Sequence, residues 1–190
     1  MDVITAIRNR RSCRAFIPDP VAETDIATMI EAAIAAPSPL NAQPWSFVAI
    51  TNDGVKARVA AEATRYKAEL LGKSGWKWLD KFSLDFLTVV PVMIAVFGNP
   101  RKSGADMIME ERTGSWRDAC GAAIQNMMLA AASLGLSTLW FTMFDKSTLK
   151  TLLGVEGDAV PLAIVMVGKA AAPTAAPPRR KVEEVTKFLR

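Results

Sequence analysis

The sequence of 190 residues contains no histidine and only two cysteines, Cys13 and Cys120. A catalytic triad built on histidine is therefore excluded, and a zinc site or a disulfide framework is disfavoured because each needs more ligands than the chain supplies. The sequence also lacks a G-x-G-x-x-G stretch and a P-loop, which disfavours a Rossmann dinucleotide site and a Walker site. With so few acids, bases and metal ligands in suitable patterns, we expect no metal and no catalytic side chain, and we expect a bound organic cofactor to carry the chemistry.

The chain also has little excess charge. A net charge of +4 favours anionic ligands, but the excess is small and is not gathered in one long run. Nucleic-acid binding is argued against, because groove-reading motifs and aromatics interleaved with the basic residues are missing. A membrane span is argued against too: residues 119–144 carry no charge, but polar side chains interrupt them and Gly135–Ser137 indicates a helix end followed by a strand. The first residues lack the pattern of a signal peptide, which points to the cytoplasm.

Apolar residues recur with helical and strand periods along the chain. Helices are expected over residues 2–9, 23–36, 52–71, 115–134 and 146–153, and strands over residues 46–51, 91–97, 138–144 and 160–167. Residues 72–88 carry Trp76, Trp78, Phe82 and Phe86 and leave two interpretations open. They form either an amphipathic stretch packed on the core or an aromatic lid over a ligand pocket.

Two further segments lie outside this periodic pattern. Residues 99–114 are polar and charged and predict a loop, while the residues after Gly168 are rich in alanine and proline. The latter composition favours an extended, stiff chain, and it ends in a short amphipathic segment. We therefore expect residues 1–168 to form one domain and residues 169–190 to form an arm that wraps around a partner subunit.

Two short stretches near the start carry the candidate site. Arg10–Arg14 places three guanidiniums and the hydroxyl of Ser12 within five residues, a pattern that suits a phosphate, with a solvated helix cap as the alternative. Pro37–Trp45 is a run of turn formers and amide side chains that leads into an apolar strand. Together the two stretches suggest a site for a phosphorylated, aromatic, hydrogen-bonding ligand, and flavin mononucleotide (FMN) fits that description.

The two stretches belong to a larger pattern. It continues in Asp118–Ala119, Gln125–Asn126, Gly135–Thr138, Trp140, Phe144–Asp145 and Arg179–Val185. As a whole, this pattern resembles the FMN-dependent nitroreductase family. The resemblance is close over residues 1–50 and 115–190 and weak over residues 52–114, where proteins of this family vary and build their substrate pockets.

The resemblance implies an α+β fold with a central mixed β-sheet flanked by helices. It also implies an intertwined homodimer with exchange of the C-terminal arms and with FMN at the interface. The implied activity is that of a flavoprotein oxidoreductase: NADH or NADPH gives hydride to flavin N5 and leaves, and a nitroaromatic or quinone then takes its place. The alternative is a flavin enzyme of the same fold with different chemistry, a dehydrogenase or a reductive dehalogenase.

The resemblance further implies a role for individual residues of the site. Arg10, Arg11 and Ser12 would hold the FMN phosphate. They would be helped by Arg179 and Arg180 of the arm. Arg14 would reach N1 and the C2 carbonyl of the ring, where it would stabilise the negative charge that gathers on reduction. Pro37, Ser38 and Pro39 would contact the same flavin from the other subunit. Asn41 and Gln43 would hydrogen-bond the ring or the ribityl chain, although Asn41 could instead shape the turn. A backbone N–H of Thr142 or Met143 would bind N5.

Overall fold

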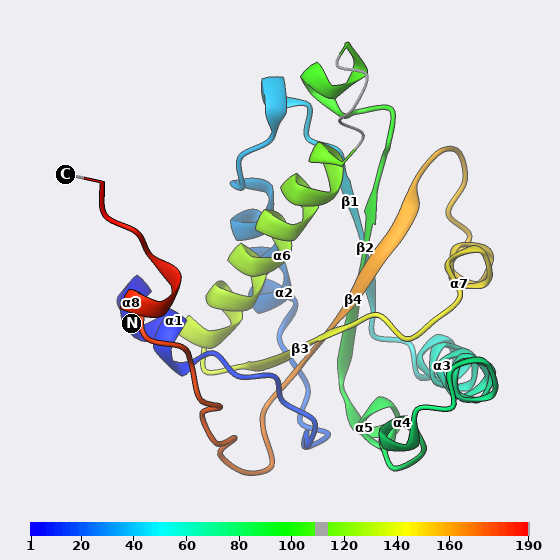
Figure 1. Cartoon of the computed structure of the whole chain (residues 1–190). Helices are drawn as coiled ribbons and strands as arrows, with labels where there is room; N and C mark the ends of the chain where they lie inside the picture. The colour runs from blue at the N-terminus through cyan, green and yellow to red at the C-terminus, as the bar shows by residue number, and fades with distance from the viewer. Residues whose placement is uncertain (109–113, 190) are drawn as a thin grey trace.

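A four-stranded sheet lies between two layers of helices in the computed structural model, which describes residues 1–108 and 114–189 (Figure 1). The strands are β1 (Trp45–Ile50), β2 (Val92–Gly98), β3 (Ser137–Phe141) and β4 (Val160–Gly168), in the spatial order β1-β2-β4-β3. All three pairings between these strands are antiparallel. The only parallel pairing among the described residues is a single bridge between Ser12 and Thr138.

The expectation of a mixed sheet is therefore wrong for the four strands of this chain. That expectation came from the resemblance, and the pattern of burial does not correct it: every residue of β2 is buried, and such continuous apolar runs are typical of parallel sheets that are covered on both faces. Here helices cover both faces of an antiparallel sheet, so the same pattern arises without parallel neighbours. Burial alone does not specify the direction of a strand.

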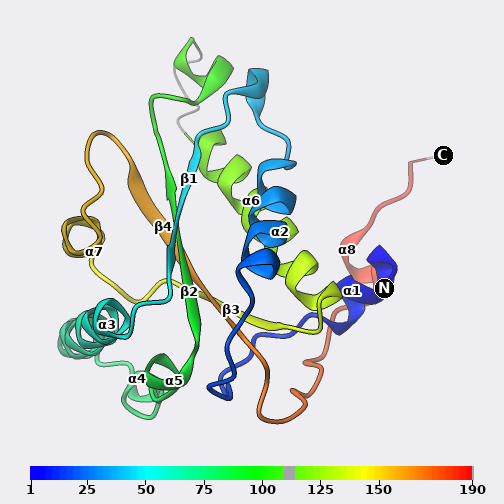
Figure 2. The same ribbon diagram turned by 180° about the vertical axis from the view of Figure 1, so that it is seen from behind.

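The two faces of the sheet bury alternate residues of β2. Met93, Ala95 and Phe97 pack in the core beneath the layer of α3 (Asp53–Ser74) and α7 (Lys146–Leu152). Ile94 packs with the opposite layer, formed by α2 (Glu23–Ile34) and α6 (Ser115–Ser133). Figure 2 shows the two layers from behind, with α1 (Val3–Asn9) beside one end of α6.

Most of the expected elements are present, with small differences at their ends. The third strand stops at Phe141 and not at residue 144, because Phe144 turns back to donate its N–H to the carbonyl of Thr142 at 3.1 Å. The side chain of Asp145 then caps α7. The loop expected over residues 99–114 contains a short 3-10 turn, η2 (Gly104–Met107), and the rest of that expectation falls partly on residues 109–113, outside the described residues.

Residues 72–88, for which a packed amphipathic stretch and an aromatic lid were both open, are partly buried and partly exposed. They form two short helices, α4 (Lys77–Asp80) and α5 (Phe86–Val89). Phe86 is buried in the core, whereas the side chains of Trp76 and Trp78 are more than half exposed. The packed interpretation therefore holds at Phe86, and the two tryptophans are left on the surface.

The C-terminal arm runs along the outside of the domain. Its last backbone bond to the domain joins the N–H of Ala171 to the carbonyl of Ala15 at 2.8 Å, and every described residue from 171 onward is exposed. The arm contains one short helix, α8 (Val182–Val185), which lies near α1 in both views (Figures 1 and 2). Within the described part of the chain, no helix has the length and apolar character that crossing a membrane requires.

Candidate functional site

The first part of the site is positioned by the end of α1. Asp2 begins this helix by accepting the N–H of Thr5 at 3.0 Å, and the helix ends at Asn9. The chain then turns onto the edge of the sheet, where Cys13 donates its N–H to the carbonyl of Thr138 at 2.9 Å. This contact fixes the arginine-rich segment beside the start of β3.

The arm completes a small cationic pocket at this edge. The pocket has a volume of about 190 Å³ and is lined by Arg10, Arg11, Ser12, Arg14, Thr174, Ala175, Pro177 and Arg179. A second cavity of about 350 Å³ shares Arg10, Arg11 and Thr174 with it and extends along Gly135–Thr138. The structure thus brings together five of the residues assigned to the phosphate and the ring, although Arg179 is far from the others in the sequence. Arg180 is exposed and does not line the pocket.

The positive charge in this pocket has no counter-charge among the described residues. Among the described residues, no carboxylate lies within ion-pair distance of Arg10, Arg11, Arg14 or Arg179. Burial lowers the pKa of Arg10, and the nearby guanidiniums of Arg179 and Arg11 lower it further. Like charges held together without an anion repel one another, so a bound anion would relieve this repulsion.

Arg11 shows the same shortage of partners at the level of single atoms. Its Nη1 donates to the carbonyls of Arg8 and Arg10, at 2.5 and 2.8 Å. Its Nε is buried and has no acceptor among the described residues. A buried donor without an acceptor costs about 1–3 kcal/mol. The unpaired guanidiniums that line the pocket suit a ligand rich in acceptor oxygens, and a phosphate group has this chemistry.

Arg14 lies on the side of the pocket nearest the aromatic segment. Its guanidinium carbon is 5.7 Å from the centre of the Phe82 ring, and its Nη1 donates to the carbonyl of Ser12 at 3.4 Å. Phe82 was not among the sequence-predicted site residues, although its place in an aromatic-rich segment was a signal. A cation beside an aromatic ring is favourable and leaves the other face of the guanidinium to a ligand.

The turn after β3 presents a second set of donors. Neither the backbone N–H of Thr142 nor that of Met143 has an acceptor among the described residues. Both residues follow the strand whose first residues line the second cavity, which shares Arg10 and Arg11 with the cationic pocket. The turn therefore offers unpaired N–H groups at the two residues for which the resemblance implied a hydrogen bond to flavin N5.

Residues Pro37–Gln43 lie far from the arginines in the fold. The 3-10 turn η1 (Pro39–Asn41) sits at the end of α6 opposite to α1, and the 19 residues of α6 separate the two ends by about 28 Å (Figure 1). Within one chain, the structure does not bring Pro37, Ser38, Pro39, Asn41 or Gln43 to the arginines.

The same turn is strained. Leu40, Asn41 and Gln43 have φ angles of 51°, 53° and 44°, in the left-handed region that costs a residue with a side chain about 1–2 kcal/mol. Ser38 supports the turn by accepting the N–H of Gln43 at 3.0 Å on its Oγ. Backbone strain of this kind gathers at functional sites, which agrees with a role for this turn in binding.

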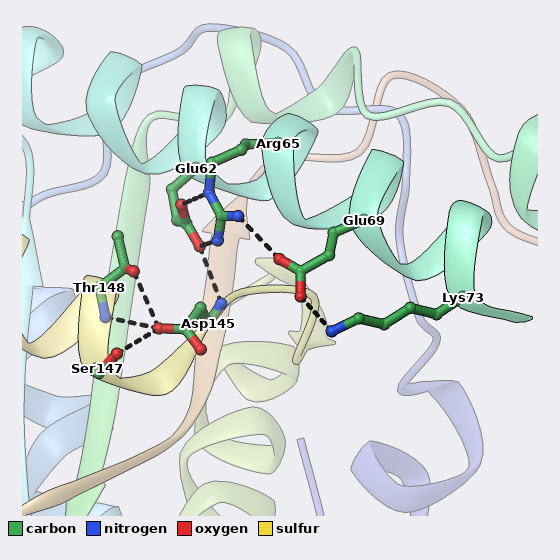
Figure 3. Close-up of polar contacts among 7 residues, drawn as sticks. All are labelled: Glu62, Arg65, Glu69, Lys73, Asp145, Ser147 and Thr148. Atoms are coloured by element: carbon green, nitrogen blue, oxygen red, sulfur yellow. Dashed lines mark hydrogen bonds and ion pairs between the residues drawn. The ribbon is translucent and has the colours of Figure 1, made fainter.

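A buried carboxylate that the sequence reasoning did not identify lies behind the turn after β3 (Figure 3). Glu62 of α3 accepts two hydrogen bonds from Arg65 and one from the backbone N–H of Asp145. The hydrogen bonds from Arg65 keep the pKa of Glu62 below its usual value despite burial. The spacing of Glu62, Arg65, Glu69 and Lys73 on one helix face was the available signal, but such spacing is typical of an exposed face.

Comparisons with known proteins agree on one family. The family described as the nitroreductase family matches residues 7–169. A protein of Methanothermobacter thermautotrophicus, provisionally named NADH dehydrogenase/NAD(P)H nitroreductase, is 27% identical over 172 residues, which cover 88% of this chain and 77% of that protein. The iodotyrosine deiodinase of Haliscomenobacter hydrossis is 26% identical over 171 residues, covering 84% of this chain and 75% of that protein.

Two solved structures are similar over the whole chain. A BluB-like flavoprotein of Clostridium difficile superimposes with a TM-score of 0.83 at 27% identity, and each chain is covered completely. A provisionally assigned nitroreductase of Desulfovibrio desulfuricans in complex with FMN superimposes with a TM-score of 0.77 at 26% identity, covering 100% of this chain and 98% of that chain.

Proposed function

This chain belongs to the nitroreductase family of flavin-dependent oxidoreductases, and we propose that it uses NADH or NADPH to reduce nitroaromatic or quinone-type acceptors through bound FMN. The observation that carries the proposal is the cationic pocket of Arg10, Arg11, Arg14 and Arg179, which has no carboxylate partner among the described residues. A similar protein of known structure binds FMN, which supports the same cofactor here.

The residues of the pocket fit the phosphate of FMN. Arg10, Arg11 and Arg179 supply charge and donors, and each charge-assisted hydrogen bond would contribute about 1.5–3 kcal/mol. Ser12 adds a hydroxyl at the same edge.

The ring would extend from this pocket along β3. Arg14 would lie near its electron-accepting edge, and the N–H groups of Thr142 and Met143 would be donors to it. The chemistry that FMN supplies when bound is two-electron transfer through its N5 atom, from a nicotinamide that leaves to an acceptor that takes its place. The lining of the cationic pocket offers no carboxylate or imidazole as an acid or base, so water would supply the protons.

A second copy of this chain would complete the site. Pro37–Gln43 is about one length of α6 away from the arginines, so in a homodimer this turn would reach the cofactor of the other subunit. The arm favours the same assembly, because it carries apolar side chains that its own chain leaves exposed, Val182, Val185, Phe188 and Leu189.

Titration with FMN tests the proposal directly. Purified protein is expected to bind FMN and to show a flavin absorbance band. The double variant Arg10→Ala, Arg14→Ala is expected to bind FMN at least roughly a hundredfold more weakly, because two charge-assisted contacts are lost. The control is Arg58→Ala, which removes the same charge from α3, outside the pocket. Wild-type protein that is colourless after incubation with excess FMN and removal of the unbound flavin would contradict the proposal.

A second candidate function is reductive dehalogenation or dehydrogenation by the same fold. The likeness to an iodotyrosine deiodinase favours it, because the sequence identity to that enzyme is 26% and the identity to the nitroreductase relative is 27%. The two functions separate in a paired assay of FMN-loaded protein. Oxidation of NADPH or NADH driven by a nitroaromatic or a quinone favours the first. Halide release from a halogenated phenol when dithionite has reduced the bound FMN, with no such release and no nicotinamide oxidation when NADH or NADPH is the only reductant, favours the second.

A further inference from the structure

Glu62 is a buried charge whose position calls for an explanation. It is 6% exposed and lies on the inner side of α3, and it is the one charged side chain that is buried among the described residues. Burying a carboxylate is unfavourable unless it is paired and hydrogen-bonded. An ion pair with Arg65 would not require burial, because the Arg65 side chain is itself half exposed.

The hydrogen bonds of Glu62 divide between helix and turn. Its Oε2 accepts from Nε of Arg65 at 2.7 Å, and its Oε1 accepts from Nη2 of Arg65 at 2.9 Å. Oε1 also accepts the backbone N–H of Asp145 at 3.0 Å (Figure 3). This last bond joins α3 to the end of the turn that follows β3, 83 residues further along the chain.

The turn is held at both of its ends. At one end, Phe141 is paired with Ile164 in the sheet. At the other end, the N–H of Asp145 donates to Glu62. The preceding residue, Phe144, is buried, and its ring centre lies 6.5 Å from that of Phe141. The unpaired N–H groups of Thr142 and Met143 lie between these two anchors.

We propose that Glu62 is a positioning residue of the flavin site, which holds the turn so that the N–H groups of Thr142 and Met143 stay directed at the acceptor atoms of the flavin ring. The inference rests on the proposed function, since that function places the ring beside this turn. Glu62 acts through the backbone and touches neither the cofactor nor a substrate. Donors fixed before the ligand arrives need no reorganisation when it binds.

The substitution that tests this role is Glu62→Met. Methionine has a similar length and helix propensity but no acceptor for the N–H of Asp145. Its matched control is Glu69→Met, which is on the same helix and also removes a carboxylate from Arg65, but has no contact with the turn. A third variant, Glu62→Gln, keeps an oxygen that can accept from Asp145. If Glu62→Met does not fold, Glu62→Asp replaces it, because the shorter side chain keeps the charge and withdraws the acceptor.

Two measurements decide the outcome. Hydrogen exchange of the amides of Phe144 and Asp145 without added FMN should be about tenfold faster or more in Glu62→Met and unchanged in Glu69→Met. The reduction potential of bound FMN should shift in Glu62→Met, stay at the wild-type value in Glu69→Met, and return close to that value in Glu62→Gln. A purely structural role would move the exchange rates and leave the potential unchanged.

The possible failures are distinguishable. Wild-type protein that does not bind FMN overturns the proposed function and this inference together. Wild-type protein that binds FMN, with exchange or potential unchanged in Glu62→Met, overturns the inference and leaves the proposed function standing. Equal shifts of the potential in Glu62→Met and Glu69→Met overturn it as well, because they would trace the effect to Arg65 and not to the turn.

Discussion

At the scale of single residues, Asp145 is an ionised helix cap. Its Oδ1 accepts from Oγ of Ser147 at 2.6 Å, from the N–H of Thr148 at 2.8 Å and from the hydroxyl of Thr148 at 2.9 Å. These hydrogen bonds lower the pKa of Asp145 to about 2, from an ordinary value near 3.8. The charged form is therefore favoured by folding.

The pH dependence of stability follows from this shift. A carboxylate whose pKa is lower in the folded state contributes stability above its unfolded pKa, and that contribution is lost as the pH falls toward the folded value. We expect Asp145→Ala to lower the free energy of unfolding by about 1 kcal/mol at pH 7 and to have less effect as the pH falls from about 4 toward 2. Urea unfolding at several pH values measures this, and a difference that grows on acidification would contradict it.

The residues of the site differ in how far the sequence could predict them. Arg10, Arg11 and Arg14 are neighbours in the chain, so their common pocket is a local property that spacing alone suggests. Arg179 reaches the same pocket from the arm, and only the resemblance to a family connected the two. Glu62 was missed because its partner is a backbone N–H in a distant turn, and no side-chain pattern marks such a bond.

At the scale of elements, the segment from Trp76 to Phe86 links the surface to the core. Trp76 and Trp78 stack with ring centres 5.9 Å apart, and Trp78 meets Phe82 edge to face at 6.2 Å. Lys67 of α3 holds the segment by donating to the carbonyls of Asp80 and Phe82, at 3.1 and 2.7 Å. Phe82 is therefore held beside Arg14, and Trp78 contacts Phe82 although its own ring is exposed.

Substitutions at an exposed and a buried position of this segment separate packing from binding. We expect Trp78→Ala to change the free energy of unfolding by about 0.5 kcal/mol or less and to raise KM for an aromatic acceptor. The control, Phe86→Ala, removes a buried ring and should cost about 3–5 kcal/mol of stability. Unfolding curves together with steady-state kinetics provide both readouts. A large loss of stability in Trp78→Ala with KM unchanged would favour the packed interpretation for the whole segment.

The elements also show which structural features can be predicted from sequence. Helix and strand positions follow from periodicity, and α6 is observed over Ser115–Ser133 where residues 115–134 were expected. Strand direction was not predictable, because β2 and β4 are buried on both faces whichever way their neighbours run. The end of β3 was misplaced because Phe144 is as apolar as a strand residue, yet it packs on the core from within a turn.

At the scale of the whole molecule, the arm is the feature that a single chain leaves unexplained. Its apolar side chains are between 54% and 85% exposed, although α8 lies near α1. On α1 itself, Val3, Ile4 and Ile7 are exposed as well. Two adjacent apolar surfaces at one end of the molecule are what a second copy would cover.

The triple variant Val182→Ser, Val185→Ser, Phe188→Ser tests this assembly while keeping Arg179 in place. Burial of each of these side chains contributes about 1.5–3 kcal/mol, so we expect the dissociation constant of the dimer to be at least about a hundredfold higher than that of wild type. Sedimentation across a dilution series measures this, with Lys187→Ala as a control on the same exposed arm. FMN affinity should fall in parallel with dimerisation, because the partner's Pro37–Gln43 turn is lost even though the arginine pocket is intact. A monomer that binds FMN as tightly as wild type would show that one chain holds the cofactor alone.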